Sequence, residues 1–322
     1  GPIPNPQSPI PNPQSPFLLF ITRILILLLK YIKIKSIYLF KDKMKNNFSP
    51  KFIPDSSGKF LFMRHGESIF NKMREDPSRV YNPDLCDAHL SKEGIEQSKL
   101  KQKDINELNI IKVFVSPYFR ALETMTYALE SYPNVENIKA IVHPQISEVV
   151  CCGNDFIIDI KETKAKFNMN SKIKVDWSLF DEFIRKSKFD ENFFFFENIN
   201  LLDNKTKEEI YIKLKTLYDK GDMKEYKNEL GKFLKEHYEY YRKYESFKHS
   251  NERFDKFKNY LKNEFKENLN DTNKKILCVC HSALLSAALS NTPFLKDEIE
   301  EDKEKCDNLY QIKNAEIISI LI

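Results

Sequence analysis

Three short apolar runs in this chain end abruptly in polar residues. Runs of four to eight apolar residues bounded by turn-forming residues are typical of buried strands. We therefore predict three core strands, each followed at once by residues able to do chemistry. The runs and the residues that end them are Phe60–Met63 before Arg64-His65-Gly66, Ile111–Val115 before Ser116-Pro117, and Ile276–Cys280 before His281-Ser282.

Helices are predicted between and after these strands, together with two further strands. Alternating strands and helices are typical of a mostly parallel sheet with helices on both faces. We therefore predict an α/β fold, a three-layer sandwich whose mostly parallel central sheet is flanked by helices. The expected helices are Phe70–Arg74, Lys92–Asn106, one with Arg120 in its first turn, and Ala283–Ser290, and the further strands are Ile138–Val142 and Ala315–Ile322.

The stretch between residues 148 and 275 exceeds what such a sheet needs. It is rich in aromatic and charged residues, and Phe254, Phe257 and Leu261 recur at helical spacing on one face. We predict a helical insertion at about residues 155–267 within a domain that spans residues 44–322. The aromatic run Phe193–Phe196 is interpreted as core of this insertion rather than as a substrate platform.

The first 43 residues differ in composition from the rest. A Pro-rich repeat is followed by an apolar run of thirteen residues, Phe17–Leu29, which is short for a membrane span of about 20 residues. Six basic residues against Asp42 give this segment a net charge of +5, which leaves −1 on residues 44–322 out of +4 overall. We expect residues 1–43 to be a non-native or disordered leader, with Met44 as the native start. A short membrane anchor is the alternative.

The near-neutral charge of residues 44–322 argues against a nucleic-acid surface. The six cysteines include the vicinal pair Cys151-Cys152 and no Cys-x-x-Cys, and these spacings suit neither disulfides nor zinc. We interpret them as reduced thiols, which favours the cytosol. A cytoplasmic protein without nucleic-acid or membrane partners is therefore expected, and its oligomeric state stays open.

The polar strand ends converge on one kind of ligand. In an open α/β sheet the carboxyl ends of parallel strands form the ligand-binding edge. Arg64, His65, Arg120 and His281 would meet there. Arginine forks and free backbone amides suit a phosphate group, and a neutral imidazole is a competent nucleophile.

Four ordered motifs resemble the histidine phosphatase superfamily, in its phosphoglycerate-mutase-like branch. The motifs are Arg64-His-Gly-Glu-Ser with Asn71, Asp87-Ala-His-Leu-Ser-Lys-Glu-Gly94-Ile-Glu-Gln97, Ser116-Pro-x-x-Arg-Ala-x-x-Thr124, and His281 at a strand end. Gly66 and Gly94 within them are expected where the backbone needs a residue without a side chain.

The resemblance implies a role for each matching residue. His65 would be the nucleophile that forms a phosphohistidine, Glu148 the general acid, and His281 a catalytic donor on the far side of the phosphate. The phosphate would be bound by Arg64, Asn71, Arg120 and Ser282. Neither a metal nor a cofactor is implied, and Glu123 and Asp155 are the reserve candidates for the acid.

The residues after Glu148 favour hydrolysis over isomerisation. Mutases of this branch carry Arg-His-Tyr-Gly there, whereas this chain has Val149-Val-Cys-Cys-Gly153, which offers no ligand for a substrate carboxylate. We predict a metal-independent phosphomonoesterase that acts on a phosphorylated small molecule. The alternatives are a cofactor-dependent phosphoglycerate mutase and a pseudo-phosphatase that serves as a binding scaffold.

Overall fold

The structure is a computed structural model, and it describes residues 58–170, 172–236, 244–289, 312–320 and 322. These residues belong to one compact unit, Phe52–Ile322. The leader predicted at residues 1–43 and the cysteine at position 306 lie outside the described residues. No helix in the described ranges is long and apolar enough to cross a membrane.

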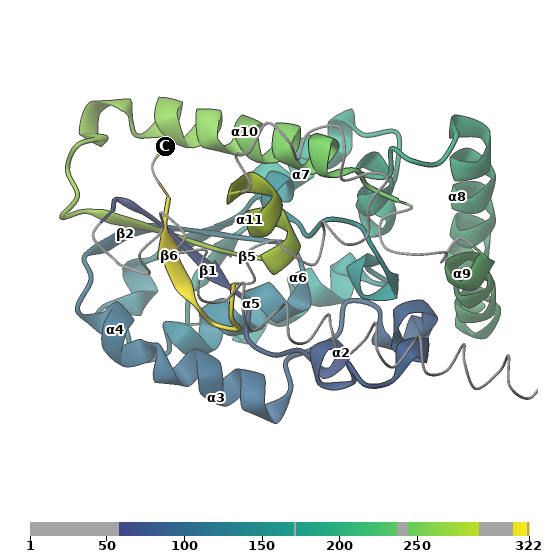
Figure 1. The fold of residues 1–322 in the computed structure, drawn as a ribbon, viewed down its shortest axis with the longest axis horizontal. Helices are drawn as coiled ribbons and strands as arrows, with labels where there is room; N and C mark the ends of the chain where they lie inside the picture. The colour runs from purple at the N-terminus through teal and green to yellow at the C-terminus, as the bar shows by residue number, and fades with distance from the viewer. Residues whose placement is uncertain (1–57, 171, 237–243, 290–311, 321) are drawn as a thin grey trace, which may run out of the picture. The chain divides into compact units, whose positions relative to one another are not determined.

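A sheet forms the centre of the described unit (Figure 1). It has six strands, in the order β4-β3-β2-β5-β1-β6. Neighbouring strands from β4 to β1 run parallel, and β6 pairs with β1 antiparallel. The strands are β1 Phe60–Arg64, β2 Ile110–Val115, β3 Lys139–Val142, β4 Lys174–Asp176, β5 Lys275–Cys280 and β6 Ile317–Ser319.

Helices cover both faces of this sheet, as predicted (Figure 1). The helices are α2 Ile69–Lys72, α3 Lys92–Leu100, α4 Gln102–Asn106, α5 Phe119–Ala128, α6 Ile160–Asn170, α7 Ser178–Lys186, α8 Asn204–Asp219, α9 Met223–Glu236, α10 Phe247–Glu264 and α11 Ser282–Leu289. The short 3-10 turns include η4 Pro144–Ile146, η5 Gly153–Asp155 and η6 Glu191–Glu197.

The two-residue period of the strands divides the core into two layers. Leu61 and Met63 of β1 pack in the cluster that contains α5, whereas Phe60 and Phe62 pack in the cluster that contains α10 and α11. Side chains of successive strand residues point to opposite faces of a sheet, so an unbroken apolar run needs cover on both sides. The predicted three-layer sandwich is therefore confirmed.

The insertion has a core of its own. Phe193, Phe195 and Phe196 pack with α8 and α9 in a third cluster, and all three side chains are buried. The interpretation of this aromatic run as insertion core is confirmed for these three residues, whereas the buried Phe194 packs in the main cluster that contains α5. The insertion is not entirely helical, however, because β4 lies within it and extends the sheet beside β3. A three-residue edge strand is stabilised by pairing with a distant strand, which a local pattern does not reveal.

Two predicted elements differ from the structure. The helix predicted at Lys92–Asn106 is divided into α3 and α4, because the Lys101 amide donates to Ser98 three residues back and tightens the turn. The strand predicted at Ala315–Ile322 is the shorter β6, preceded by Ala315 with a left-handed φ of 56°. This conformation is incompatible with an extended strand.

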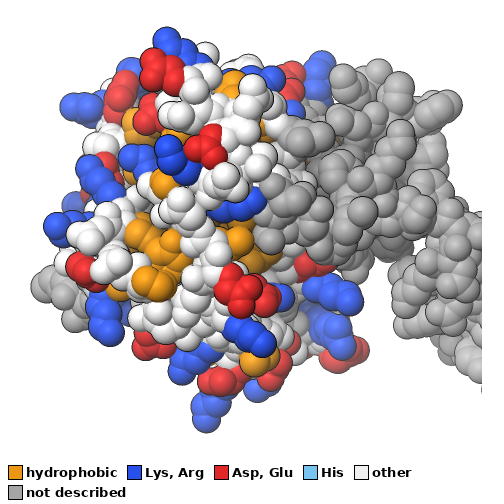
Figure 2. Space-filling model, turned by 90° about the vertical axis from the view of Figure 1, so that its left-hand side faces the viewer, with side chains coloured by type: hydrophobic (Ala, Val, Ile, Leu, Met, Phe, Trp, Pro, Cys, Tyr) orange, Lys and Arg blue, Asp and Glu red, His pale blue; other side chains and the backbone are white. Residues whose placement is uncertain are grey.

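Basic and acidic side chains are intermingled on the face drawn in Figure 2, around a central group of hydrophobic side chains. Charges of both signs therefore alternate over this part of the described surface. This pattern agrees with the small net charge calculated for residues 44–322.

Candidate active site

The sheet register brings the two predicted catalytic histidines together. Arg64 pairs with Cys280 across β1 and β5, so the next residue on each strand is a histidine. The His65 amide donates to Cys280 O at 3.0 Å, and the His65 and His281 ring centroids lie 5.2 Å apart. Both rings are buried, at the carboxyl ends of two parallel strands.

The tautomer of His65 follows from one hydrogen bond. His65 Nδ1 lies 2.6 Å from Gly66 O, and a carbonyl oxygen can only accept, so Nδ1 carries the proton. The Nε2 atom of the neutral ring therefore keeps its lone pair. Burial, together with the charges of Arg120 and Arg64, holds the pKa of His65 well below its usual value. His65 is thus neutral at neutral pH.

His281 is anchored through its other nitrogen. Its Nε2 lies 2.6 Å from Ser116 Oγ, while the buried Nδ1 has no hydrogen-bond partner in the described structure and lies 3.9 Å from Glu148 Oε2. Burial and the charge of Arg120 hold the pKa of His281 well below its usual value. When the Ser116 hydroxyl donates to Nε2, the single ring proton sits on Nδ1 and can be donated to an anion.

Arg120 is completely buried and held by polar groups on one side. Its Nη1 donates to Asn154 O at 2.9 Å and its Nη2 to Asp155 Oδ1 at 3.1 Å, with Asp87 Oδ1 at 4.0 Å. The guanidinium also lies over the Tyr118 ring, 4.5 Å from its centroid. These contacts leave Nε without a partner in the described structure. The fork is therefore fixed before any ligand binds.

Arg64 supplies a second cation beside the histidines. Its Nη1 donates to Ile312 O at 2.5 Å, and its Nε is buried without a partner among the described residues. Burial lowers the pKa of Arg64, with the charge of Glu148 raising it in part and the charge of Arg120 lowering it further. Two guanidinium groups with unused donors therefore face a site whose two imidazoles are neutral, and an anion would satisfy them.

Glu148 lies close to both histidines, with a carboxylate oxygen within 4.8 Å of a ring nitrogen of each. Its Oε1 accepts hydrogen bonds from the Val149 amide at 2.9 Å and from the Leu284 amide, near the start of α11, at 3.1 Å. The two donors occupy Oε1, so a proton on the carboxyl group is carried by Oε2, the oxygen nearer to His281. Burial raises the pKa of Glu148 to about 7.

The two reserve candidates for the acid have other partners. Asp155 Oδ1 accepts from Arg120, and Asp155 Oδ2 accepts from the Cys151 and Cys152 amides. Glu123 binds His89 at 2.8 Å and the Leu90 amide at 2.8 Å. Asp155 therefore orients Arg120. Glu148 therefore stays the predicted acid.

Asn71 and Ser282, the remaining predicted phosphate ligands, lie at the starts of helices. Asn71 Oδ1 accepts from the Ser68 amide at 3.3 Å in a capping box of α2, and Ser282 is the first residue of α11. Within the described residues, no hydrogen bond joins either side chain to the arginines or histidines above. Their phosphate-binding roles stay predictions.

Gly66 and Gly94 allow two backbone segments to touch. A Cβ atom on Gly66 would lie 2.4 Å from Gly94 O, and one on Gly94 would lie 2.0 Å from Glu67 O. Neither glycine has a positive φ. Close approach of the α3 backbone to the loop after β1 therefore explains both residues.

His65, Glu148 and His281 offer ligand atoms that lie within 4.8 Å of one another, a set that could also hold a metal ion. The charges of Arg64 and Arg120 act directly on His65, and they oppose a cation as strongly as they favour an anion. The absence of a metal from the reaction stays a prediction.

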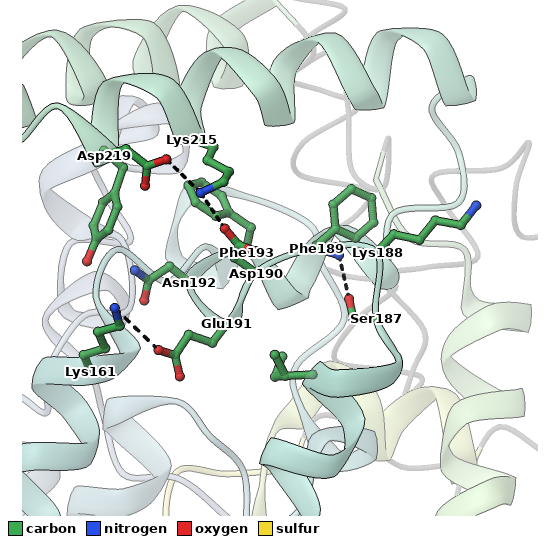
Figure 3. Close-up of a pocket in the computed structure, with 12 residues that line it drawn as sticks. Lys161, Ser187, Lys188, Phe189, Asp190, Glu191, Asn192, Phe193, Lys215 and Asp219 are labelled. Carbon is green, nitrogen blue, oxygen red and sulfur yellow. Dashed lines mark hydrogen bonds and ion pairs between the residues drawn. The ribbon is translucent and has the colours of Figure 1, made fainter.

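A separate pocket of about 410 Å³ lies in the insertion, between α6, α7, η6 and α8 (Figure 3). Most of its charged side chains pair with one another: Lys215 Nζ lies 2.7 Å from Asp190 and 2.8 Å from Asp219, and Lys161 lies 3.9 Å from Glu191. It includes none of the predicted catalytic residues.

Ser116 and Arg253 contact the site, and the sequence alone did not assign a role to either. Ser116 was part of a recognised motif, so its bond to His281 could have been inferred from that motif. The contacts of Arg253 with the loop that carries Glu148 had no sequence signal, because this residue stands about 105 positions further along the chain.

Comparison with known proteins supports the family assignment. Residues 60–152 match the model of the histidine phosphatase superfamily (branch 1). This part of the chain therefore carries the signature of that superfamily, as the motifs predicted. No curated protein matches the sequence.

The described fold also resembles solved structures at a low level. A mycobacterial glucosyl-3-phosphoglycerate phosphatase is 12% identical, with a TM-score of 0.40 and coverage of 80% of this chain and 88% of that one. An ecdysone phosphate phosphatase from Bombix mori is 15% identical, with a TM-score of 0.40 and coverage of 80% and 86%. A phosphoglycerate mutase from Bacillus anthracis is 14% identical, with a TM-score of 0.37 and coverage of 81% and 87%. These values are too low to transfer a substrate.

Proposed function

We propose that this protein is a metal-independent phosphomonoesterase that works through a phosphohistidine on His65. The observation that carries the proposal is the bond from His65 Nδ1 to Gly66 O, which leaves Nε2 unprotonated beside two arginines. A nucleophile needs a free lone pair, and the transferred phosphoryl group needs fixed cations around its oxygens.

The first half of the reaction forms the phosphoenzyme. The His65 Nε2 lone pair attacks phosphorus, and the bond from phosphorus to the ester oxygen breaks with its electron pair on that oxygen. Glu148 Oε2 gives its proton to the departing alkoxide, and the raised pKa of Glu148, about 7, keeps that proton available near neutral pH. Arg64, Arg120 and His281 Nδ1 would balance the charge on the phosphoryl oxygens.

The second half regenerates the enzyme. Glu148, now a carboxylate, takes a proton from a water molecule whose oxygen attacks phosphorus. The bond between phosphorus and nitrogen breaks, and its electron pair returns to Nε2. Inorganic phosphate leaves, and His65 and Glu148 are back in their starting protonation states.

Hydrolysis is favoured over the mutase alternative by the residues that follow Glu148. Val149 and Val150 are fully buried and bring no charge to the site. A mutase must hold a second acidic group of its substrate in two orientations, and this segment supplies no cation for it. The complete set of His65, Arg64, Arg120 and His281 argues against the pseudo-phosphatase alternative.

The test is turnover of nitrophenyl phosphate and of an alkyl phosphate by purified protein with a chelator present. We expect steady release of phosphate, together with acid-labile, base-stable label on the wild type and none on His65→Ala. His89→Ala is the matched control, since this histidine is half exposed and bonds Glu123. Label on His65→Ala, or loss of activity in chelator with recovery on adding metal, would contradict the proposal. Conversion of 3-phosphoglycerate to its isomer would identify a mutase.

A further inference from the structure

A buried arginine of the insertion donates hydrogen bonds to backbone carbonyl groups of the loop that carries Glu148. Arg253 on α10 donates from Nη1 to Gln145 O at 2.8 Å and to Ser147 O at 2.9 Å, and from Nη2 to Glu148 O at 3.2 Å. Its Nε and Nη2 also bind the two carboxylate oxygens of Glu245 at 2.9 and 3.1 Å. Every N–H of this guanidinium therefore has an acceptor.

Glu245, the ion-pair partner of Arg253, also bonds this loop, at Val150. Glu245 is fully buried, and its Oε2 accepts from the Val150 amide at 3.0 Å. Its own amide donates to Val150 O at 3.2 Å, and its Oε1 accepts from His249 at 3.0 Å. Glu245 and Arg253 together thus fix the backbone from residue 145 to residue 150.

The loop is also held by burial of its apolar side chains, by Asn198, which donates to Ser147 Oγ at 3.2 Å, and by the Leu284 amide, which donates to Glu148 Oε1. It connects η4 to η5 with no strand pairing, and Glu148 lies in its middle. A buried ion pair adds little net stability by itself, because desolvation of the two charges offsets much of their attraction. Such a pair can instead restrict the conformations of the loop that carries Glu148, and this effect does not depend on a net gain in stability.

We propose that Glu245 and Arg253 form a clamp that positions Glu148 for proton transfer to the leaving group. This inference rests on the proposed function. In the described structure both members bond the backbone of the loop and neither bonds His65 or the Glu148 carboxyl group, so both are positioning residues. Proton transfer requires the acid within hydrogen-bond reach of the ester oxygen, and a shift of about 1 Å can cost on the order of 100-fold in rate.

The clamp predicts a loss that depends on the leaving group. Lysine at position 253 keeps the charge but presents a single nitrogen in place of the fork, so it cannot hold both Glu245 and the loop. We expect Arg253→Lys to lower kcat/KM for an alkyl phosphate about 10- to 100-fold. For nitrophenyl phosphate, whose phenolate leaves without a proton, kcat/KM should fall less than about threefold.

The quantity to measure is the ratio of kcat/KM for nitrophenyl phosphate to kcat/KM for the alkyl phosphate. Both values come from one preparation, so the ratio does not depend on the fraction of folded protein. Glu245→Gln is the second variant, since it keeps the shape of the side chain and removes its charge. Arg185→Lys, at an exposed position on α7, is the matched control and should leave the ratio unchanged.

The outcomes separate this inference from the function on which it rests. An increase in the ratio in Arg253→Lys or Glu245→Gln, with unchanged affinity for vanadate, supports the clamp. Equal losses with both substrates would overturn it while leaving the phosphohistidine mechanism intact. A wild type that hydrolyses neither substrate would instead refute the proposed function.

Discussion

At the scale of single residues, burial decides which groups are charged. Burial raises the pKa of Glu148 to about 7 and holds the pKa of His65 well below its usual value. At a pH between these two pKa values, Glu148 is protonated and His65 is neutral, as the proposed first half-reaction requires. In water, free glutamic acid and histidine would have the opposite order of pKa values.

This order predicts how activity changes with pH. We expect kcat/KM for an alkyl phosphate to fall as the pH rises through about 7, because Glu148 loses the proton that it must donate. On the acid side, activity should persist below pH 6.5, because His65 stays neutral there. The measurement is a pH profile of the wild type with the alkyl phosphate. Glu148→Gln with nitrophenyl phosphate is the reference, because its profile does not include the ionisation of Glu148. If both profiles fell in the same way above pH 7, ionisation of Glu148 would not be the cause of the fall.

The same two residues should respond differently to substitution. Glu148→Gln should cost about 10²- to 10⁴-fold with an alkyl phosphate and much less with nitrophenyl phosphate, because only the first leaving group needs a proton. His65→Ala should lose activity with both, since no phosphoenzyme can form. Measuring kcat/KM for each pair decides the roles. Equal losses in Glu148→Gln with both leaving groups would remove it as the acid.

The sequence was sufficient to find residues whose chemistry is unusual for their position. Arg64, His65 and His281 each follow an apolar run, and the structure brings all three to one edge of the sheet. The residues that orient them were harder to find. Arg253 is an ordinary charged residue in the sequence, and Asp155 was predicted only as a reserve acid. Their contacts with the Glu148 loop and with Arg120 show that both orient other groups.

At the scale of elements, the core strands were predictable because each is an apolar run. β1, β2 and β5 were located to within one residue, since apolar residues fill most of each strand. β2 is the least regular of the three, because Ile111 is exposed and Lys112 is polar. β4 and β6 were missed or overextended. They are three residues long, and pairing at the sheet edges defines them better than their own composition does.

The contact between α3 and the loop after β1 gives a prediction at this scale. Gly94→Ala would place a Cβ atom 2.0 Å from Glu67 O, so the helix or the loop must move. Overpacking of this kind costs about 1–3 kcal/mol, and the displaced loop carries His65. We expect a lower urea midpoint and at least a tenfold lower kcat/KM. Gly221 lies at an exposed turn with space around it. Gly221→Ala is the control, and we expect it to lower the stability and to leave the activity unchanged.

If Gly94→Ala matched the wild type in both measurements, the close approach would have no functional meaning. Gly221 has a φ of 72°, so its substitution carries backbone strain without touching the site. The comparison therefore distinguishes loss of stability from displacement of the catalytic loop.

At the scale of the whole described unit, the insertion contributes to the site. α10 lies across the sheet in the layer that contains Phe62 and Phe254, and its first turns hold the loop around Glu148. The sequence indicated an insertion but not this connection, because the contacts join positions about 100 residues apart. Contacts at such separation depend on the complete fold, and a local pattern carries no trace of them.

Buried neutral histidines should also make the stability of this unit depend on pH. His143 lies between Phe257 and Tyr260, with ring centroids at 4.7 and 5.0 Å, and burial lowers its pKa to about 3. In the unfolded chain its pKa is about 6.5. Between these values the unfolded state binds a proton that the folded state does not. The stabilisation is therefore complete above pH 6.5 and is lost as the pH falls toward 3.

His143→Phe tests this argument, because a phenyl ring suits the aromatic site and does not titrate. Between pH 6 and 4 the wild type should lose about 1.4 kcal/mol per pH unit more than the variant in free energy of unfolding. At pH 7.5 the two should differ little, since the variant loses only the 3.3 Å bond from the Gln145 amide. Urea unfolding at pH 7.5, 6 and 5 provides the measurement. Parallel pH dependences would mean that His143 is protonated in the folded protein, and that its surroundings are more polar than the ring contacts indicate.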